Sequence, residues 1–444
     1  MTSQTSRTPS RAFRAPLAPG RASRASDPAG GAGPVAALAV GHAAVDLYQG
    51  VVPALIPFLV AGHGLGYLAA SGVMLAATLL SSIVQPLFGA LTDRWAMPWL
   101  IPAATVVAGA GVGAAGLFGS YPLVCAAVAL SGIGVAAYHP ESARLARAAS
   151  GAGHTRMGWY SLGGNIGFAL APLLTGPVLA AGGLAATPWL VLPALAAAVL
   201  TAPVVRSLAA RTAAAQAAAR AGAGRDGAGR DDWPAFLRLS AVIGCRSVVF
   251  VGLSAFVALF AGQRFGGGAG GGSGAGTAAL FALFAGGAVG TVLGGWLAGR
   301  WGRVRTVRWA YAAAVPAVAG LLLVPGPALY GFAAAVSLAL YVPFSLQVTL
   351  GQDYLPSRIG TASGVTLGLA VSVGGVAGPV IGLLADHVGL RAALAPLALL
   401  CAVSWWIARG LPEPAEVVVA AAEGAPVAAA AVPVPEGPGR AGRA

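Results

Sequence analysis

Two ionisable residues near the start of the sequence could take up and release a proton inside an apolar segment. His42 and Asp46 lie in the apolar run 35–60 and are four residues apart, so both side chains would share one face of a helix. Asp46 falls roughly 18 Å along such a helix, near the middle of a bilayer, where ionisable groups are costly and mark candidate functional sites. The pair is predicted to exchange protons; the alternative is a structural hydrogen-bonded pair that fixes this helix to a neighbouring one. Tyr48 and Gln49 are predicted to line the same cavity.

A second group of charged residues lies where apolar runs end. The run 122–143 closes with the segment HPESAR, in which Pro140 removes a backbone donor and Glu141 and Arg144 can pair at a spacing of three. Asp93, in an adjacent loop, is expected to bind Arg144 or the positive end of a later helix. These positions predict a gate latch near one membrane surface; the alternative is an exposed ion pair worth less than about 1 kcal/mol. The full predicted latch comprises Asp93, Arg94, His139, Glu141, Arg144 and Arg300.

Arg246 is the one arginine placed well inside an apolar run. It is a candidate for the substrate cavity, although its long side chain could instead reach back to the membrane face. Three uncharged polar residues are also predicted to line the cavity, and each could alternatively form a helix–helix hydrogen bond. They are Gln85, Asn165 and Gln347.

The composition identifies the elements that must position these residues. Hydrophobic residues make up 57% of the 444 residues and charged residues 9%, against about 45–50% and 25% in soluble domains. This excludes a water-soluble enzyme and a disordered regulator, and it predicts an all-α membrane protein with about twelve spans of about 20 residues. The expected helices cover 35–60, 67–91, 100–118, 122–143, 158–180, 188–205, 239–261, 277–299, 307–324, 328–351, 360–384 and 392–409.

The expected helices divide into two halves of six. The N-terminal half covers 35–205 and the C-terminal half 237–410, and the polar, alanine- and glycine-rich segment 206–236 is predicted to link them on the cytoplasmic side. The segments 1–34 and 411–444 are rich in small residues and proline and are predicted to be disordered tails. The first tail is basic, and an organellar transit peptide is the alternative for it.

The distribution of arginine predicts the orientation. All 26 basic residues are arginines; if both termini are cytoplasmic, only Arg264 and Arg391 fall outside, Arg246 lies within a helix, and the remaining 23 are cytoplasmic. The positive-inside rule therefore predicts a multi-pass protein of the inner (plasma) membrane with both termini in the cytoplasm. The same rule explains the formal charge of +13 without a nucleic-acid partner. The absence of lysine excludes the lysine-containing phosphate-binding loop.

Two short motifs recur between the halves. The segment 89–95 (GALTDRW) is echoed by 295–301 (GWLAGRW) at an offset of 206, and 161–164 (SLGG) by 372–375 (SVGG) at an offset of 211. Two groups of six helices with matching motifs imply parallel repeats about an axis along the membrane normal.

These motifs also carry a family resemblance. The pattern G-x-L-x-D-R in 89–94 resembles the cytoplasmic-loop signature of the major facilitator superfamily, although Gly299 stands in the second copy where an acid is usual. Four segments spread over most of 40–410 are similar to the fosmidomycin resistance branch of that superfamily. They are 91–99 (LTDRWAMPW), 138–144 (YHPESAR), 163–167 (GGNIG) and 384–387 (LADH).

The resemblance implies a proton-driven efflux carrier for small drug-like or anionic compounds. A phosphonate antibiotic is anionic at neutral pH, so the resemblance implies that Arg246 grips the substrate's oxygens with its planar guanidinium, across the cavity from His42 and Asp46. The alternatives are an uptake symporter or facilitator for a sugar or organic acid and, from a different class, a transporter-like receptor.

The expected partners are a small-molecule substrate, protons and the lipid bilayer, and the protein is expected to function as a monomer. No cofactor and no metal site are predicted, because Cys125, Cys245 and Cys401 lie in separate apolar runs without metal-ligand spacing. No nucleophile–base motif or H-E-x-x-H motif is present, so no enzymatic activity is expected.

Overall fold

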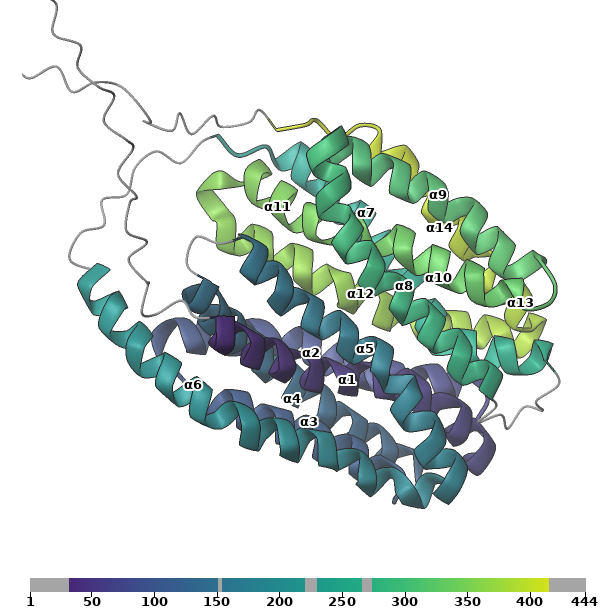
Figure 1. The fold of residues 1–444 in the computed structure, drawn as a ribbon. Coiled ribbons are helices and arrows are strands. Elements are labelled where there is room, and N and C mark those ends of the chain that lie inside the picture. Colours follow the sequence, from purple (N-terminus) through teal and green to yellow (C-terminus); the bar gives the residue numbers. More distant parts are fainter. Residues whose placement is uncertain (1–31, 151–153, 220–229, 266–273, 415–444) are drawn as a thin grey trace, which may run out of the picture.

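The computed structural model describes residues 32–150, 154–219, 230–265 and 274–414, and this part of the chain is almost entirely helical. The first half of the described chain forms six α-helices and one 3₁₀ helix; the α-helices are labelled in Figure 1. They are α1 (Ala32–His63), α2 (Tyr67–Arg94), α3 (Leu100–Ala115), α4 (Tyr121–Ser150), α5 (His154–Gly182), η1 (Leu184–Val191) and α6 (Leu192–Ala219).

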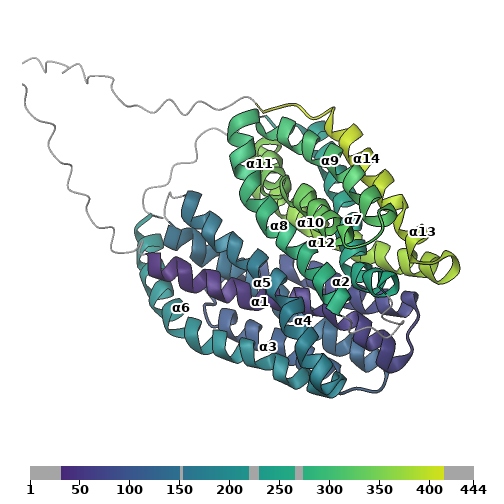
Figure 2. The same ribbon diagram turned by 45° about the vertical axis from the view of Figure 1, so that its right-hand side comes forward.

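The second half repeats this pattern with two additional helix breaks. Figures 1 and 2 show the two halves as separate bundles lying side by side, purple to teal for the first and teal through green to yellow for the second. The second bundle contains α7 (Trp233–Arg264), α8 (Gly274–Trp301), α9 (Arg303–Leu323), α10 (Ala328–Tyr341), α11 (Phe344–Tyr354), η2 (Pro356–Arg358), α12 (Ile359–Val388), α13 (Leu390–Leu394) and α14 (Pro396–Ala408).

The helices have the length and composition of membrane spans. Among the described residues, ten helical segments are long and apolar enough to cross a bilayer, and two shorter apolar helices cover Leu100–Ala115 and Ser372–Val388. A helix satisfies its own backbone donors and acceptors, which a hydrocarbon environment requires. These twelve segments agree with the all-α fold expected from the sequence.

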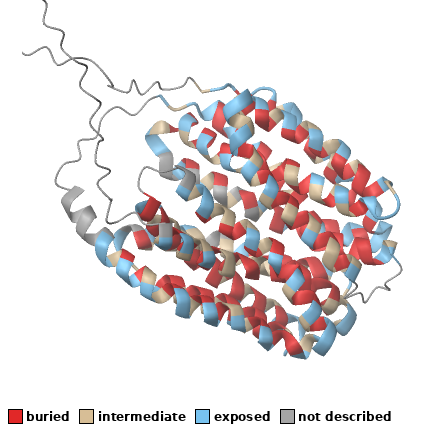
Figure 3. Ribbon diagram, in the orientation of Figure 1, coloured by how far each residue is buried: buried red, intermediate tan, exposed pale blue. Residues whose placement is uncertain are grey.

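The outer surface of the bundle is apolar, as contact with lipid requires. Buried residues line the helix faces that turn toward other helices, and exposed residues lie on the outward faces (Figure 3). Large apolar side chains are prominent among the exposed ones, including Val199 at 74% and Trp406 at 69% exposure. An exposed apolar surface of this extent marks a membrane-contacting protein.

The predicted helix boundaries differ from the observed ones at both ends of the connection between the halves, where α7 already begins at Trp233. The helix expected over 188–205 is α6, which runs to Ala219 and so continues into the segment 206–236 that was expected to be a linker. The reason is local, because residues 206–219 are rich in alanine, the strongest helix former.

Two other expected helices are interrupted at prolines. The helix expected over 328–351 is divided into α10 and α11 just before Phe344, and Pro343 caps the second piece. The helix expected over 392–409 is divided into α13 and α14, with Pro396 at the first position of α14. Proline has no backbone N–H and therefore removes one hydrogen bond from the ladder of a helix, whereas it is well suited to a first turn.

The halves meet through α2 against α12 and α5 against α8. At the membrane side where α2 begins and α12 ends, which we call the far side, both carboxylate oxygens of Asp386 accept backbone N–H groups of α2. The distances are 2.8 Å to Tyr67 N and 2.9 Å to Leu68 N. The Gln263 amide also donates to the Tyr67 hydroxyl there.

The opposite membrane side carries the α6–α7 connection, and we call it the linker side. One face of α12 shows that the halves separate toward this side. Gly364, Gly368, Gly375 and Gly382 are spaced by four, seven and seven residues and therefore share a helix face. A methyl group at Gly375 or Gly382 would collide with α2, whereas one at Gly364 or Gly368 would meet none of the described atoms within 4 Å. The contact between halves is therefore closed at the far side and open at the linker side.

Candidate functional site

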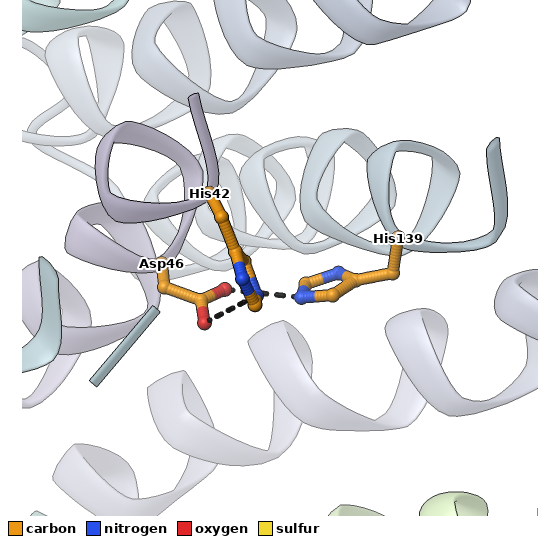
Figure 4. A group of neighbouring side chains, drawn as sticks. All are labelled: His42, Asp46 and His139. Atoms are coloured by element: carbon orange, nitrogen blue, oxygen red, sulfur yellow. Dashed lines mark ion pairs between the residues drawn. The ribbon is translucent and has the colours of Figure 1, made fainter. Parts of the chain in front are cut away.

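Three ionisable side chains converge between α1 and α4. Helix α1 carries His42 and Asp46 on one face, and α4 brings His139 to the same carboxylate (Figure 4). His42 Nε2 lies 3.2 Å from Asp46 Oδ2, and His139 Nε2 lies 3.1 Å from Asp46 Oδ1. We call these three residues the triad.

Backbone carbonyls hold both imidazole rings in place. Nδ1 of His42 lies 2.9 Å from the Tyr160 carbonyl oxygen, and Nδ1 of His139 lies 2.7 Å from that of Val135. A carbonyl oxygen can only accept a hydrogen bond, so we assign the proton of each neutral ring to Nδ1. The Nε2 atoms are then the ones that can gain or lose a proton beside the carboxylate.

The rest of the triad's surroundings fix the carboxylate in position. Gln49 Nε2 donates to Asp46 Oδ1 at 3.4 Å, and the ring of Tyr160 stacks on His42 with centroids 4.4 Å apart. Helix α5 approaches so closely at Gly164 that a methyl group there would overlap Asp46 Oδ2 and lie 2.8 Å from the His42 ring. Only glycine leaves room for the carboxylate at this crossing.

The triad is mostly buried but not sealed. The side chains of His42 and Asp46 are 11% and 9% exposed, and that of His139 is 22% exposed. A buried carboxylate that faces two imidazoles, one of them more exposed than the other, can hold a proton and pass it on.

The position of His139 differs from its predicted grouping. The sequence predicted His139 in the gate latch at the membrane surface, and the structure places it against Asp46 instead. The physical reason is that α4 packs against α1 at this level, and a contact between residues so far apart in sequence leaves no local pattern. The sequence singled out this segment through Pro140, the Glu141–Arg144 spacing and the resemblance of 138–144, but none of these signals pointed to Asp46.

Arg246 lies at the corresponding place in the second half. It is 2% exposed, and its Nε donates to the Leu340 carbonyl of α10 at 2.7 Å. Its guanidinium carbon stands over three aromatic rings, 4.8 Å from Phe344, 4.9 Å from Tyr341 and 5.9 Å from Phe250. The side chain is therefore buried in an aromatic cage rather than extended to the membrane face, and none of the carboxylates described in the structure forms an ion pair with it.

The predicted latch residues on α4 pair with each other. Glu141 is fully buried and accepts two hydrogen bonds from Arg144, from Nε at 2.9 Å and from Nη2 at 2.5 Å. Arg94 is exposed, and Arg300 packs over the Trp296 ring at 5.7 Å. The side chain of Asp93 lies outside the described part of the chain, so the latch stays a prediction.

Two of the uncharged polar candidates are buried and form hydrogen bonds within their own half. Tyr48 is buried and donates to the Leu190 carbonyl at 2.9 Å, and Gln347 is buried and donates to the Tyr311 hydroxyl at 2.8 Å. Both bonds stay within one half and join helices.

The other two candidates lie nearer the interface between halves or are only partly buried. Asn165 on α5 donates to Thr291 Oγ1 on α8 at 3.3 Å, and so bridges the two halves. Gln85 on α2 is half-buried. Asp386 was not recognised as a functional candidate from sequence, where it occurred only within the 384–387 resemblance.

The family of the chain follows from its sequence as a whole. The sequence model of the Major Facilitator Superfamily matches residues 38–379, which include the triad and Arg246. The chain belongs to the major facilitator superfamily. It is therefore a multi-pass membrane transporter of a family that carries small molecules across membranes, and the predicted membership is confirmed.

Two relatives match this superfamily member over most of its length. The chain is 29% identical over 363 residues to the fosmidomycin resistance protein of Escherichia coli (strain K12), covering 81% of this chain and 88% of the relative. It is 28% identical over 367 residues to the uncharacterized MFS-type transporter YfnC of Bacillus subtilis (strain 168), with 81% and 88% covered.

Solved transporter structures share the fold. A bacterial homologue of the human lysosomal transporter Spinster, in an inward-facing and occupied conformation, gives a TM-score of 0.63 at 16% identity, covering 84% of this chain and 95% of that one. A mutant of the nucleoside transporter NupG gives 0.62 at 12% identity, with 85% and 99% covered. The human organic anion transporter MFSD10 gives 0.58 at 17% identity, with 84% and 98% covered.

Proposed function

We propose that this transporter is a proton-coupled exporter of small anionic or drug-like compounds. The observation that carries the proposal is a pair of buried charges of opposite sign, one in each half. Asp46 is flanked by two imidazoles, one at each carboxylate oxygen. Arg246 is buried among aromatic rings without a described carboxylate partner.

The triad supplies the coupling to protons. A transporter that alternates between two conformations is driven by a proton gradient only if proton affinity differs between them, because a ligand shifts an equilibrium only through differential affinity. The triad lies between α1 and α4, and the more exposed His139 gives it a route to water. A movement that changes the exposure of His139 or its distance from Asp46 would change the proton affinity.

Arg246 supplies the binding of a negative charge. A buried guanidinium without a counter-charge is unfavourable, and an anionic substrate would provide that charge when it binds. The aromatic rings add apolar surface for the remainder of a drug-like molecule. The relative named for fosmidomycin resistance supports export as the direction, since fosmidomycin is a phosphonate and resistance to it would follow from its removal.

The proposed orientation rests on the distribution of arginine, and the proposed gate rests on the predicted latch residues. We place the linker side and both termini in the cytoplasm of an inner (plasma) membrane, because most arginines lie on that side. The open side of the structure is then the cytoplasmic side. Asp93, Arg94, Glu141, Arg144 and Arg300 would close it in the outward-facing state, and the transporter would act as a monomer.

The latch has its own test, in which Asp93→Asn and Arg144→Ala are compared with the parent in substrate exchange. Loss of the latch should slow turnover and favour the inward-facing state, as measured by labelling of single cysteines at the linker side. Unchanged exchange and unchanged labelling in both variants would contradict the latch.

Reconstituted vesicles test the function as a whole. The purified transporter is placed in vesicles with an imposed pH gradient, and accumulation of a radiolabelled phosphonate such as fosmidomycin is measured against vesicles with no gradient. We expect accumulation only with the gradient, and its collapse when a protonophore is added. Accumulation that is equal with and without the gradient would contradict proton coupling, and an absence of phosphonate flux would contradict the substrate class.

A further inference from the structure

The triad has an electrostatic requirement that protons alone need not satisfy. With each Nδ1 proton donated to a backbone carbonyl, neutral imidazoles direct their Nε2 lone pairs at the carboxylate oxygens. Two N···O contacts of 3.2 and 3.1 Å are then favourable only with positive charge between the atoms. Protons can provide it, and so can a metal cation.

The donor set is that of a transition-metal site. The triad offers two imidazole nitrogens and one carboxylate oxygen, and these ligand atoms lie within 4.8 Å of one another. Zn²⁺ binds such nitrogens at about 2.0–2.1 Å and such oxygens at about 2.0–2.2 Å in tetrahedral geometry, so its ligand atoms lie roughly 3.3 Å apart. The two histidine–aspartate contacts already have this separation, each to a different oxygen of the carboxylate, so a small turn of the carboxylate and an approach of the two rings would complete the set.

The surroundings resemble the support that metal-binding histidines require. A metal-bound imidazole usually donates its other N–H to a carbonyl or carboxylate, which fixes the ring and its tautomer. Both triad rings have such a carbonyl, from Tyr160 and from Val135. The partial exposure of the His139 side chain leaves a side from which an ion and a fourth ligand, such as water, can enter.

We propose that His42, Asp46 and His139 form a binding site for a divalent transition-metal ion, with Zn²⁺ as the probe. The ion binds through Nε2 of both histidines and a carboxylate oxygen, and it links α1 to α4. Imidazole ligands suit zinc, copper and nickel, whereas Mg²⁺ and Ca²⁺ prefer oxygen ligands. Sequence spacing gave no metal site because the third ligand lies on another helix, far along the chain.

The bound ion competes with protons. Metal binding requires unprotonated imidazoles and a carboxylate, so acid should weaken it and the ion should block the proton exchange assigned to the triad. The other ionisable groups near the triad are Tyr138 on α4, Tyr160 on α5 and Tyr341 on α10. Tyrosine stays protonated through the neutral range, so the pH dependence arises from the triad.

Zn²⁺ titration of the purified full-length transporter tests the site. The protein is prepared without a polyhistidine tag and with its three cysteines replaced by serine, and binding is measured in nanodiscs by competition with a chromogenic chelator. We expect one ion per chain, and affinity at pH 6 at least about tenfold below that at pH 8. The variants His139→Gln and Asp46→Asn should each lower the affinity by about tenfold or more.

Control variants separate loss of ligands from loss of fold. His387→Gln removes an exposed histidine at the far side and should bind Zn²⁺ as the parent does. His139→Cys restores a zinc ligand and should recover binding that His139→Gln has lost. X-ray absorption at the zinc edge of the parent should show two histidine nitrogens in the first coordination shell.

Two results would overturn the proposal. One is a parent protein that binds no Zn²⁺ at pH 8, and the other is binding that remains the same in both His139→Gln and Asp46→Asn. The measurement needs no transport, so its failure is distinguishable from failure of proton coupling in vesicles.

Discussion

The two halves of the transporter place opposite charges at corresponding positions. In the first half, the first helix α1 carries Asp46 and presents it to His139 on the fourth helix α4. In the second half, the first helix α7 carries Arg246 and presents it to the Leu340 carbonyl and the Tyr341 ring on the fourth helix α10. The same pair of helices thus holds a titratable group in one half and a permanent cation in the other.

The two halves differ because the fourth helix contributes a side chain in the first half and a free backbone carbonyl in the second. Helix α4 continues through its proline to Ser150 and contributes a side chain, His139. Helix α10 ends at Tyr341, before Pro343, and the last carbonyls of a helix lack partners within it. Arg246 satisfies one of them. Arginine stays charged at all physiological pH values, so only the first half can respond to protons in the proposed mechanism.

The largest effect is expected when the titratable half loses its acid. Asp46→Asn retains the size of the side chain but removes the negative charge that favours a proton on the two facing Nε2 atoms, so gradient-driven accumulation in vesicles should be abolished. Exchange of labelled for unlabelled substrate, which needs no net proton movement, should persist. Uphill accumulation by Asp46→Asn would show that coupling lies elsewhere and would end the assignment of roles to the two halves.

The matching change in the second half should abolish binding rather than coupling. Arg246→Gln should nearly eliminate phosphonate transport in both accumulation and exchange, because the counter-charge is lost. Arg246→Lys keeps the charge but loses the planar fork, and transport should fall roughly tenfold. If Arg246→Gln transports anionic and neutral compounds as well as the parent, the arginine only joins α7 to α10.

A smaller effect should follow from crowding the triad without changing its chemistry. Gly164→Ala places a methyl group against Asp46 and His42, and overpacking of this kind costs about 1–3 kcal/mol. We expect a lower melting temperature and partial loss of proton-driven accumulation. Gly158→Ala, on the same helix, meets no described atom within 4 Å; it should not lower the melting temperature and should leave accumulation unchanged. Equal losses in the two variants would mean that the triad does not depend on this crossing.

The smallest effect is expected where the halves touch at the far side. Asp386→Asn replaces a carboxylate that accepts two N–H groups at the start of α2, where the helix dipole favours a negative charge by roughly 0.3–1 kcal/mol. The ratio of inward-facing to outward-facing molecules should fall by about two- to fivefold, measured by the distance between spin labels on α2 and α12. No change in that distance distribution would show that apolar packing alone holds this side closed.

Much of the fold could be predicted from local sequence. The twelve apolar segments and the buried charged residues could be recognised because hydrophobic length and the cost of a charge in hydrocarbon are properties of contiguous residues. His42 and Asp46 were paired in the same way, since four residues fix a shared helix face. The helix breaks at Pro343 and Pro396 also have a local cause, the proline itself. These breaks were not predicted because the composition is apolar on both sides of each proline.

The composition of the site was decided only by the tertiary structure. His139 joins Asp46 because α4 packs against α1, and Arg246 is enclosed by aromatic rings because α10 ends where it does. Tyr48 and Gln347 form hydrogen bonds within their own halves because burial requires each polar group to find a partner nearby. Periodicity shows which face of a helix a residue occupies, but the residue it meets depends on how separate helices pack, and that packing is set by side-chain shapes distributed over the whole chain.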